Sequence, residues 1–65
     1  MSDLEILKAK VRKLSAQATQ SKMDLHDLSE DLPNRWEEIK EVAQACYDLY
    51  AALAEARAAV KARGG

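Results

Sequence analysis

The stretch LHDLSEDLPNRWEEI, residues 25–39, joins two apolar patterns and contains the only proline of the chain. Before the proline, leucines recur at spacings of three and four residues, which is the pattern of one face of an α-helix. Pro33 lacks a backbone donor and disfavours helical geometry at the preceding residue, so we expect the first helix to end here. Asn34 and Glu37 have the spacing of a capping box, which predicts that a second helix starts at once.

An apolar seam with this three–four spacing runs along each predicted helix. The first seam extends from Leu4 to Leu32 and predicts a helix over about residues 3–31; the second extends from Ile39 to Val60 and predicts a helix over about 35–62. The corner between them is residues 32–34. The sequence thus predicts an all-α single domain, residues 1–65, and so short a corner requires an antiparallel two-helix hairpin.

A hairpin of two helices covers each seam on one side only. At 65 residues the chain buries little surface by itself, so we expect two hairpins to associate into a four-helix bundle. Large side chains of one seam meet small ones of the other in the antiparallel register, which supports this packing. The predicted hairpin or dimer core comprises Leu7, Val11, Leu14, Leu25, Leu28, Leu32, Ile39, Val42, Cys46, Leu49, Leu53 and Val60.

Charge is distributed unevenly along the hairpin, although the formal net charge is only -1. The end with both termini carries eight basic and three acidic residues, and the corner end carries eight acidic and two basic residues. Packing two hairpins head to tail places opposite charges together, so the expected homodimer is antiparallel. Whether that dimer assembles further is left open by the pattern.

Several classes of protein are disfavoured by the sequence. Charged residues interrupt the N-terminal segment, which argues against a signal peptide or membrane span, and the single Cys46 allows no intrachain disulfide; we expect a cytoplasmic protein. Cys46 is predicted to be a small buried apolar side chain, with an intermolecular disulfide as the alternative. No glycine-rich loop or nucleophile beside a base suggests an enzyme. The basic run at residues 8–13 lacks aromatic neighbours, which argues against nucleic-acid binding.

The only histidine, His26, lies one helical turn before Glu30 and next to Asp27. Imidazole and carboxylate groups at this spacing can bind a divalent metal ion. The alternative is a partly exposed histidine paired with one of these carboxylates, since the Glu-x-x-His pattern of di-iron bundles is absent: position 23 is methionine. No other cofactor is expected.

A partner-binding surface is predicted at the corner. Asp24 and Asp31 lie in the last turns of the first helix, where negative charge opposes the helix dipole, so we expect the second helix, a dimer partner or another protein to compensate them. Trp36 is expected to fold over Leu32 and Leu28 as a plug. If it is exposed instead, it becomes the leading anchor for a partner.

The segments KMDLHDL (22–28), LP (32–33) and the tryptophan three residues later resemble a family of small Rop-like proteins encoded in nitrogen-fixation gene neighbourhoods. The resemblance implies a helical hairpin that forms a four-helix bundle and an accessory part in nitrogenase maturation or electron supply. It implies no catalytic residues. From it we expect a non-enzymatic protein that acts through protein–protein interaction, with a nitrogenase-related protein as a possible partner; a metal-handling protein is the alternative.

Overall fold

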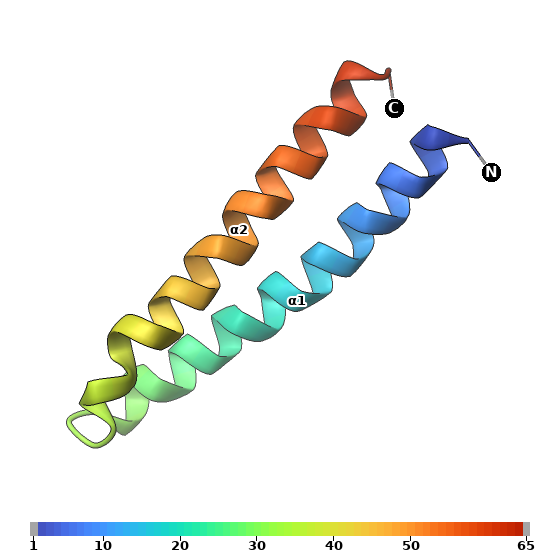
Figure 1. Ribbon diagram of the computed structural model, residues 1–65. Coiled ribbons are helices and arrows are strands. Elements are labelled where there is room, and N and C mark those ends of the chain that lie inside the picture. Colours follow the sequence, from blue (N-terminus) through green and yellow to red (C-terminus); the bar gives the residue numbers. More distant parts are fainter. Residues whose placement is uncertain (1, 65) are drawn as a thin grey trace.

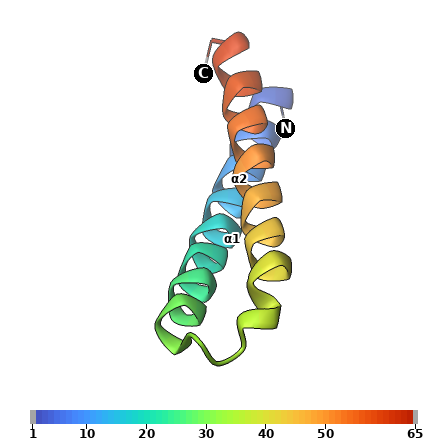
Figure 2. The same cartoon turned by 90° about the vertical axis from the view of Figure 1, so that its left-hand side faces the viewer.

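The computed structural model describes residues 2–64 and consists of two long helices side by side (Figure 1). Helix α1 is Asp3–Asp31, a short 3-10 helix η1 is Trp36–Glu38, and helix α2 is Ile39–Ala62. The rod measures 47 × 14 × 13 Å between Cα atoms. Both described ends of the chain lie at the same end of this rod, opposite the corner (Figures 1 and 2). The predicted antiparallel hairpin is therefore confirmed.

Helix α1 begins at a capped end. The hydroxyl of Ser2 accepts a hydrogen bond of 3.2 Å from the backbone N–H of Glu5, which satisfies one of the amide groups that a helix start leaves free. Its last turn contains no basic residue, and it ends at Leu32, whose backbone is extended. This is the conformation that a following proline favours, and the Leu32–Pro33 peptide bond is cis.

The start of the second helix differs from expectation. Asn34 and Glu37 do not form a cap; Arg35 adopts a left-handed conformation with φ 60°, and the 3-10 turn of η1 precedes α2, which starts at Ile39 rather than at about residue 35. The backbone N–H of Asn34 bonds instead to the carbonyl of Asp31 at 2.9 Å. The chain thus turns through a tight loop and a 3-10 segment before the regular helix begins.

The core is a narrow strip along the contact between α1 and α2. Its buried members are five: Ala18, Ser21, Leu28, Leu53 and Ala56. Small residues in this strip allow close approach of the helices. The hydroxyl of Ser21 donates a hydrogen bond of 2.7 Å to the carbonyl of Ala18, so its burial leaves no polar group without a partner.

Most of the predicted core is only partly buried in the hairpin. The seam residues of intermediate exposure are Leu7, Val11, Leu14, Leu25, Val42, Cys46, Leu49 and Val60. Leu32 and Ile39, next to the corner, are 40% and 39% exposed. The four-helix bundle stays a prediction, and it is the arrangement that would cover these side chains. Neither α1 nor α2 offers an apolar run of the length that a bilayer crossing requires.

We predict that Leu28→Ala will destabilise the hairpin by about 2–5 kcal/mol, because Leu28 is 1% exposed and its loss leaves a cavity. Urea unfolding followed by circular dichroism measures the change. Met23→Ala is the control, since Met23 is on the same helix but 53% exposed. Equal destabilisation by the two substitutions would contradict this description of the core.

Candidate functional site

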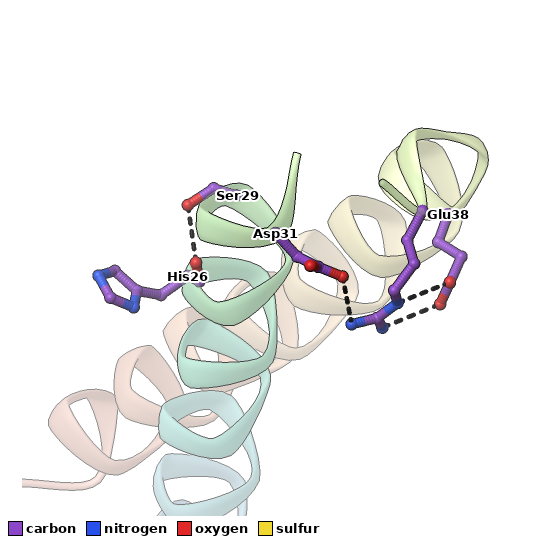
Figure 3. A network of polar contacts seen from close by, with 5 residues as sticks. His26, Ser29, Asp31 and Glu38 are labelled. Carbon is purple, nitrogen blue, oxygen red and sulfur yellow. Dashed lines mark hydrogen bonds and ion pairs between the residues drawn. The ribbon is translucent and has the colours of Figure 1, made fainter. Parts of the chain in front are cut away.

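Arg35 is the centre of a polar network at the corner. Its guanidinium donates two hydrogen bonds to the carboxylate of Glu38, at 2.8 and 3.1 Å, and its Nη1 lies 3.8 Å from an oxygen of Asp31. Figure 3 shows this single guanidinium between the two labelled carboxylates. The network connects the end of α1 to η1 and supplies part of the compensation expected for the negative charge at the end of α1.

The pair also changes the proton affinities of its members. The hydrogen bonds from Arg35, and then its positive charge, lower the pKa of Glu38 below its ordinary value. The hydrogen bond and charge of Glu38 correspondingly raise the pKa of Arg35. Both side chains are partly exposed, at 49% and 43%, so water weakens the interaction. Its clearest role is to fix the conformation of the corner.

The candidate metal ligands lie on a different side of α1. In Figure 3 the imidazole of His26 points away from the Arg35 network. Its Nδ1 is 3.8 Å from Asp27 and its Nε2 is 3.7 Å from Glu30, and one ligand atom from each residue falls within 4.8 Å of the others. The three candidate ligands predicted from the sequence therefore lie close together, and their role as metal ligands stays a prediction.

The geometry of this cluster limits what it can bind. The two carboxylates face different nitrogens of one imidazole, whereas ligands of a single ion converge on one point at bonds of about 2.0–2.2 Å. In this conformation, binding of one ion by all three residues would require these side chains to change rotamer. All three side chains are largely exposed, at 66–76%. The arrangement also has the form of the partly exposed ion pairs that were the alternative expectation.

An acidic groove runs along one open side of the hairpin near the corner. It is lined by Ser21, Asp24, Glu38, Glu41, Val42 and Ala45. The Oδ1 of Asp24 accepts a hydrogen bond of 3.0 Å from the side-chain amide of Gln20, while Glu38 is held by Arg35. The groove combines an apolar floor with carboxylates from both helices. Asp31, the other predicted partner-binding carboxylate, lies in the Arg35 network beside it.

Trp36 does not form the expected plug. Its side chain is 62% exposed. The prediction placed it one turn into a regular helix, where it would lean on Leu32; because α2 starts only at Ile39, Trp36 belongs instead to the 3-10 turn. Tyr47 is also exposed, at 72%, and Tyr50 at 39%. Trp36 and Tyr47 therefore lie largely in solvent, whereas Tyr50 is mostly covered.

The other end of the rod is basic. A groove of about 250 Å³ between the helices is lined by Lys8, Val11, Arg12, Arg57 and Val60. Val11 of α1 and Val60 of α2 line the same groove, as the antiparallel pairing of the two seams predicts. Near the termini, Nη1 of Arg63 lies 3.4 Å from a carboxylate oxygen of Asp3 and joins the two helices there.

A family model described as Rop-like matches residues 2–64. The chain belongs to the Rop-like family. Its relatives include a UPF0437 protein of Azorhizobium caulinodans, 54% identical over 61 residues, which span 94% of this chain and 88% of the relative. A second is the UPF0437 protein in the nifX-nifW intergenic region of Frankia alni, 48% identical over 52 residues, which span 80% of this chain and 63% of that protein.

A solved structure also resembles this Rop-like chain. It is the NMR structure of a structural-genomics target protein, with a TM-score of 0.86 and 52% sequence identity, and the match covers 94% of this chain and 86% of that protein. The similarity extends over nearly the whole hairpin.

We predict that Arg35→Asn will raise the pKa of Glu38 toward its ordinary value of about 4.3, because the hydrogen bonds that hold it down are removed. Asparagine tolerates the left-handed backbone at this position, so the turn can persist. An NMR titration of the side-chain carboxyl carbons measures the shift, with Lys40→Asn as the control.

The same pair has a defined pH dependence. A carboxylate whose pKa is lowered by folding contributes its stability above the unfolded pKa and loses it as the pH falls through the folded pKa. The advantage of the native chain over Glu38→Gln is therefore full at neutral pH and disappears below about pH 4. An advantage that grew on acidification would contradict the pairing.

Proposed function

We propose that this Rop-like protein is a non-enzymatic accessory protein of nitrogen fixation that acts through protein–protein interaction. Nitrogenase maturation or electron supply is the proposed setting, and the cytoplasm is the proposed location. The proposal is supported by the Frankia alni relative, whose name assigns it to the nifX-nifW intergenic region. The descriptions of the family and of the relatives name no reaction.

The acidic groove supports binding to a basic surface of another protein. Asp24 and Glu41 contribute carboxylates from different helices, and the floor between them provides the apolar contact that protein interfaces combine with a polar rim. Because Arg35 fixes the conformation of Glu38, the groove is partly preorganised. Charges of this kind steer association and select partners more than they add affinity. A nitrogenase-related protein with a basic patch is the proposed partner.

We predict that deletion of the gene will slow growth on N₂ but not on ammonium, and that the double variant Asp24→Lys with Glu41→Lys will fail to restore growth. The reason is that reversed charge in the groove repels a basic partner. Glu5→Lys is the matched control, since it reverses an exposed carboxylate at the other end of the rod.

Equal growth of the deletion strain on both nitrogen sources would contradict the link to nitrogen fixation. Full rescue by the double variant, with normal growth of the Glu5→Lys strain, would instead contradict the role of the groove while leaving the link intact. Immunoblotting of each strain shows whether the variants accumulate to the same level.

A second candidate function is divalent-cation binding by His26, and the observation that favours it is the proximity of Asp27 and Glu30. An imidazole and a carboxylate one turn apart form a two-ligand chelate on a single helix. Such a site would suit a protein that handles metal during cofactor assembly. A second copy of the hairpin could complete it with further ligands.

We predict that Zn²⁺ or Ni²⁺ added to untagged protein will shift or broaden the ring resonances of His26, together with amide resonances of residues 26–30. The variant His26→Ala should abolish the effect, because the imidazole is the strongest ligand of the cluster. Asp48→Asn serves as the control for general cation attraction. Unchanged His26 resonances at millimolar metal would end this alternative.

A further inference from the structure

The two open sides of the hairpin differ in the size of their apolar side chains. Ala43, Tyr50 and Arg57 recur every seven residues on α2 and so lie along one flank. Trp36, in the 3-10 turn that leads directly into α2, continues this spacing, and we term these four residues the aromatic flank. The opposite flank carries Glu38, Ala45, Ala52 and Ala59 at the same interval, which we term the alanine flank. The acidic groove belongs to the alanine flank, because Glu38 and Ala45 line it.

The aromatic flank carries two exposed aromatic side chains toward the corner end. Trp36 and Tyr50 are 62% and 39% exposed, and the seam residues Leu32 and Ile39, next to the corner, are 40% and 39% exposed. Farther along this flank, Arg57 lines the basic groove together with Lys8 and Val60. One flank therefore presents aromatic rings at one end and cations above an apolar floor at the other.

We propose that the aromatic flank is the surface through which a second copy of this chain binds, and that Trp36 of each copy inserts into the basic groove of the other. The proposal deepens the antiparallel homodimer expected from the seams. It rests on the expectation that two hairpins form a four-helix bundle. It adds which side of the hairpin is buried in that dimer and which contact anchors the dimer.

The chemistry of the two ends is complementary. A guanidinium or ammonium group over the face of an indole is attracted by its π-electrons, and Arg57 and Lys8 border the groove that would receive the ring. Val11 and Val60 supply its apolar floor. The alanine flank lacks this match, since burying it would remove Asp24 and Glu41 from water, and buried charges are costly without well-placed partners.

The lengths agree as well. In an antiparallel dimer whose two-fold axis is perpendicular to the rod, α2 packs against α2 of the other copy, so paired residues lie symmetrically about one position. If Trp36 meets Val60 of the partner subunit, that position is residue 48, between Tyr47 and Tyr50. The middle of the arm from the corner at 34 to Gly64 is residue 49, about 1.5 Å away along the helix. Full overlap of the two rods therefore brings Trp36 to the groove.

The area is sufficient for a stable complex. A side of the rod measuring 47 by 14 Å covers roughly 650 Å² on each copy, or about 1,300 Å² in total. Specific interfaces bury about 1,200–2,000 Å². The acidic groove remains on the outside of such a dimer, available to a third protein.

Sedimentation equilibrium of the full chain tests the proposal. The native protein should dimerise, and Trp36→Ala should raise the dimer dissociation constant about tenfold or more, as truncation of an aromatic anchor seated in a pocket does. Ile6→Ala is the matched control. Ile6 is 53% exposed and precedes Asp24 by eighteen residues, five whole turns, so it lies on the side of the alanine flank and should change the constant less than twofold.

A double-mutant cycle with Arg57→Ala locates the contact. Since Trp36 is the only tryptophan, its emission should also move to shorter wavelength as concentration promotes dimerisation. If Trp36 contacts Arg57 of the partner subunit, the two substitutions together will weaken the dimer by less than the product of their separate effects.

The alternative outcomes distinguish the three parts of the proposal: the dimer, the flank that is buried, and the insertion of Trp36 into the basic groove. A folded monomer at all accessible concentrations would overturn the dimer itself. A dimer that Trp36→Ala leaves unchanged, or that Ile6→Ala weakens as much, would overturn the choice of flank only. Independent effects of Trp36 and Arg57 would overturn the insertion into the basic groove. Failure of the growth experiment above would leave all three results standing, because it concerns the role in nitrogen fixation.

Discussion

Two helices can cover each other on one side only, and this constraint governs the structure. Only five residues along the contact between α1 and α2 are buried, and three of them are alanine or serine. Apart from Leu28 and Leu53, the larger members of both seams stay partly exposed. Hydrophobic stabilisation is roughly proportional to the apolar area removed from water. The isolated hairpin therefore gains only part of the hydrophobic stabilisation that its apolar side chains can provide. The proposed second copy would supply the remainder.

Charge and shape are arranged along the same axis. The corner end combines carboxylates with exposed aromatic rings, while the end with the termini combines cations with a shallow apolar groove. In a head-to-tail pair, the carboxylates and aromatic rings of one copy would therefore face the cations and the apolar groove of the other. The flanks divide these features further: rings and cations lie on one side, and the acidic groove lies on the other. Self-association and binding of a different protein therefore need not compete for one surface.

The parts that were predictable from the sequence are those determined by local periodicity. The three–four spacing of leucines predicts α1, and the one-turn separation of His26 and Glu30 brings them together because both are on one helix. The start of α2 was not predictable in this way. Asn34 and Glu37 favour a helix cap there. Arg35 instead pairs with acidic residues on both sides, Asp31 and Glu38, and its left-handed backbone moves the start of α2 to Ile39. The acidic residues four before and three after Arg35 were the available signal. The exposure of Trp36 follows from that displacement.

The position of both described ends of the chain, residues 2 and 64, at one end of the rod has a practical consequence (Figure 1). A domain or label fused to either terminus would be held away from the corner by nearly the whole 47 Å length. In a head-to-tail pair, two such fusions would sit at opposite ends of a rigid spacer. The Rop-like hairpin would then act as a molecular ruler that sets the separation of whatever is attached to it.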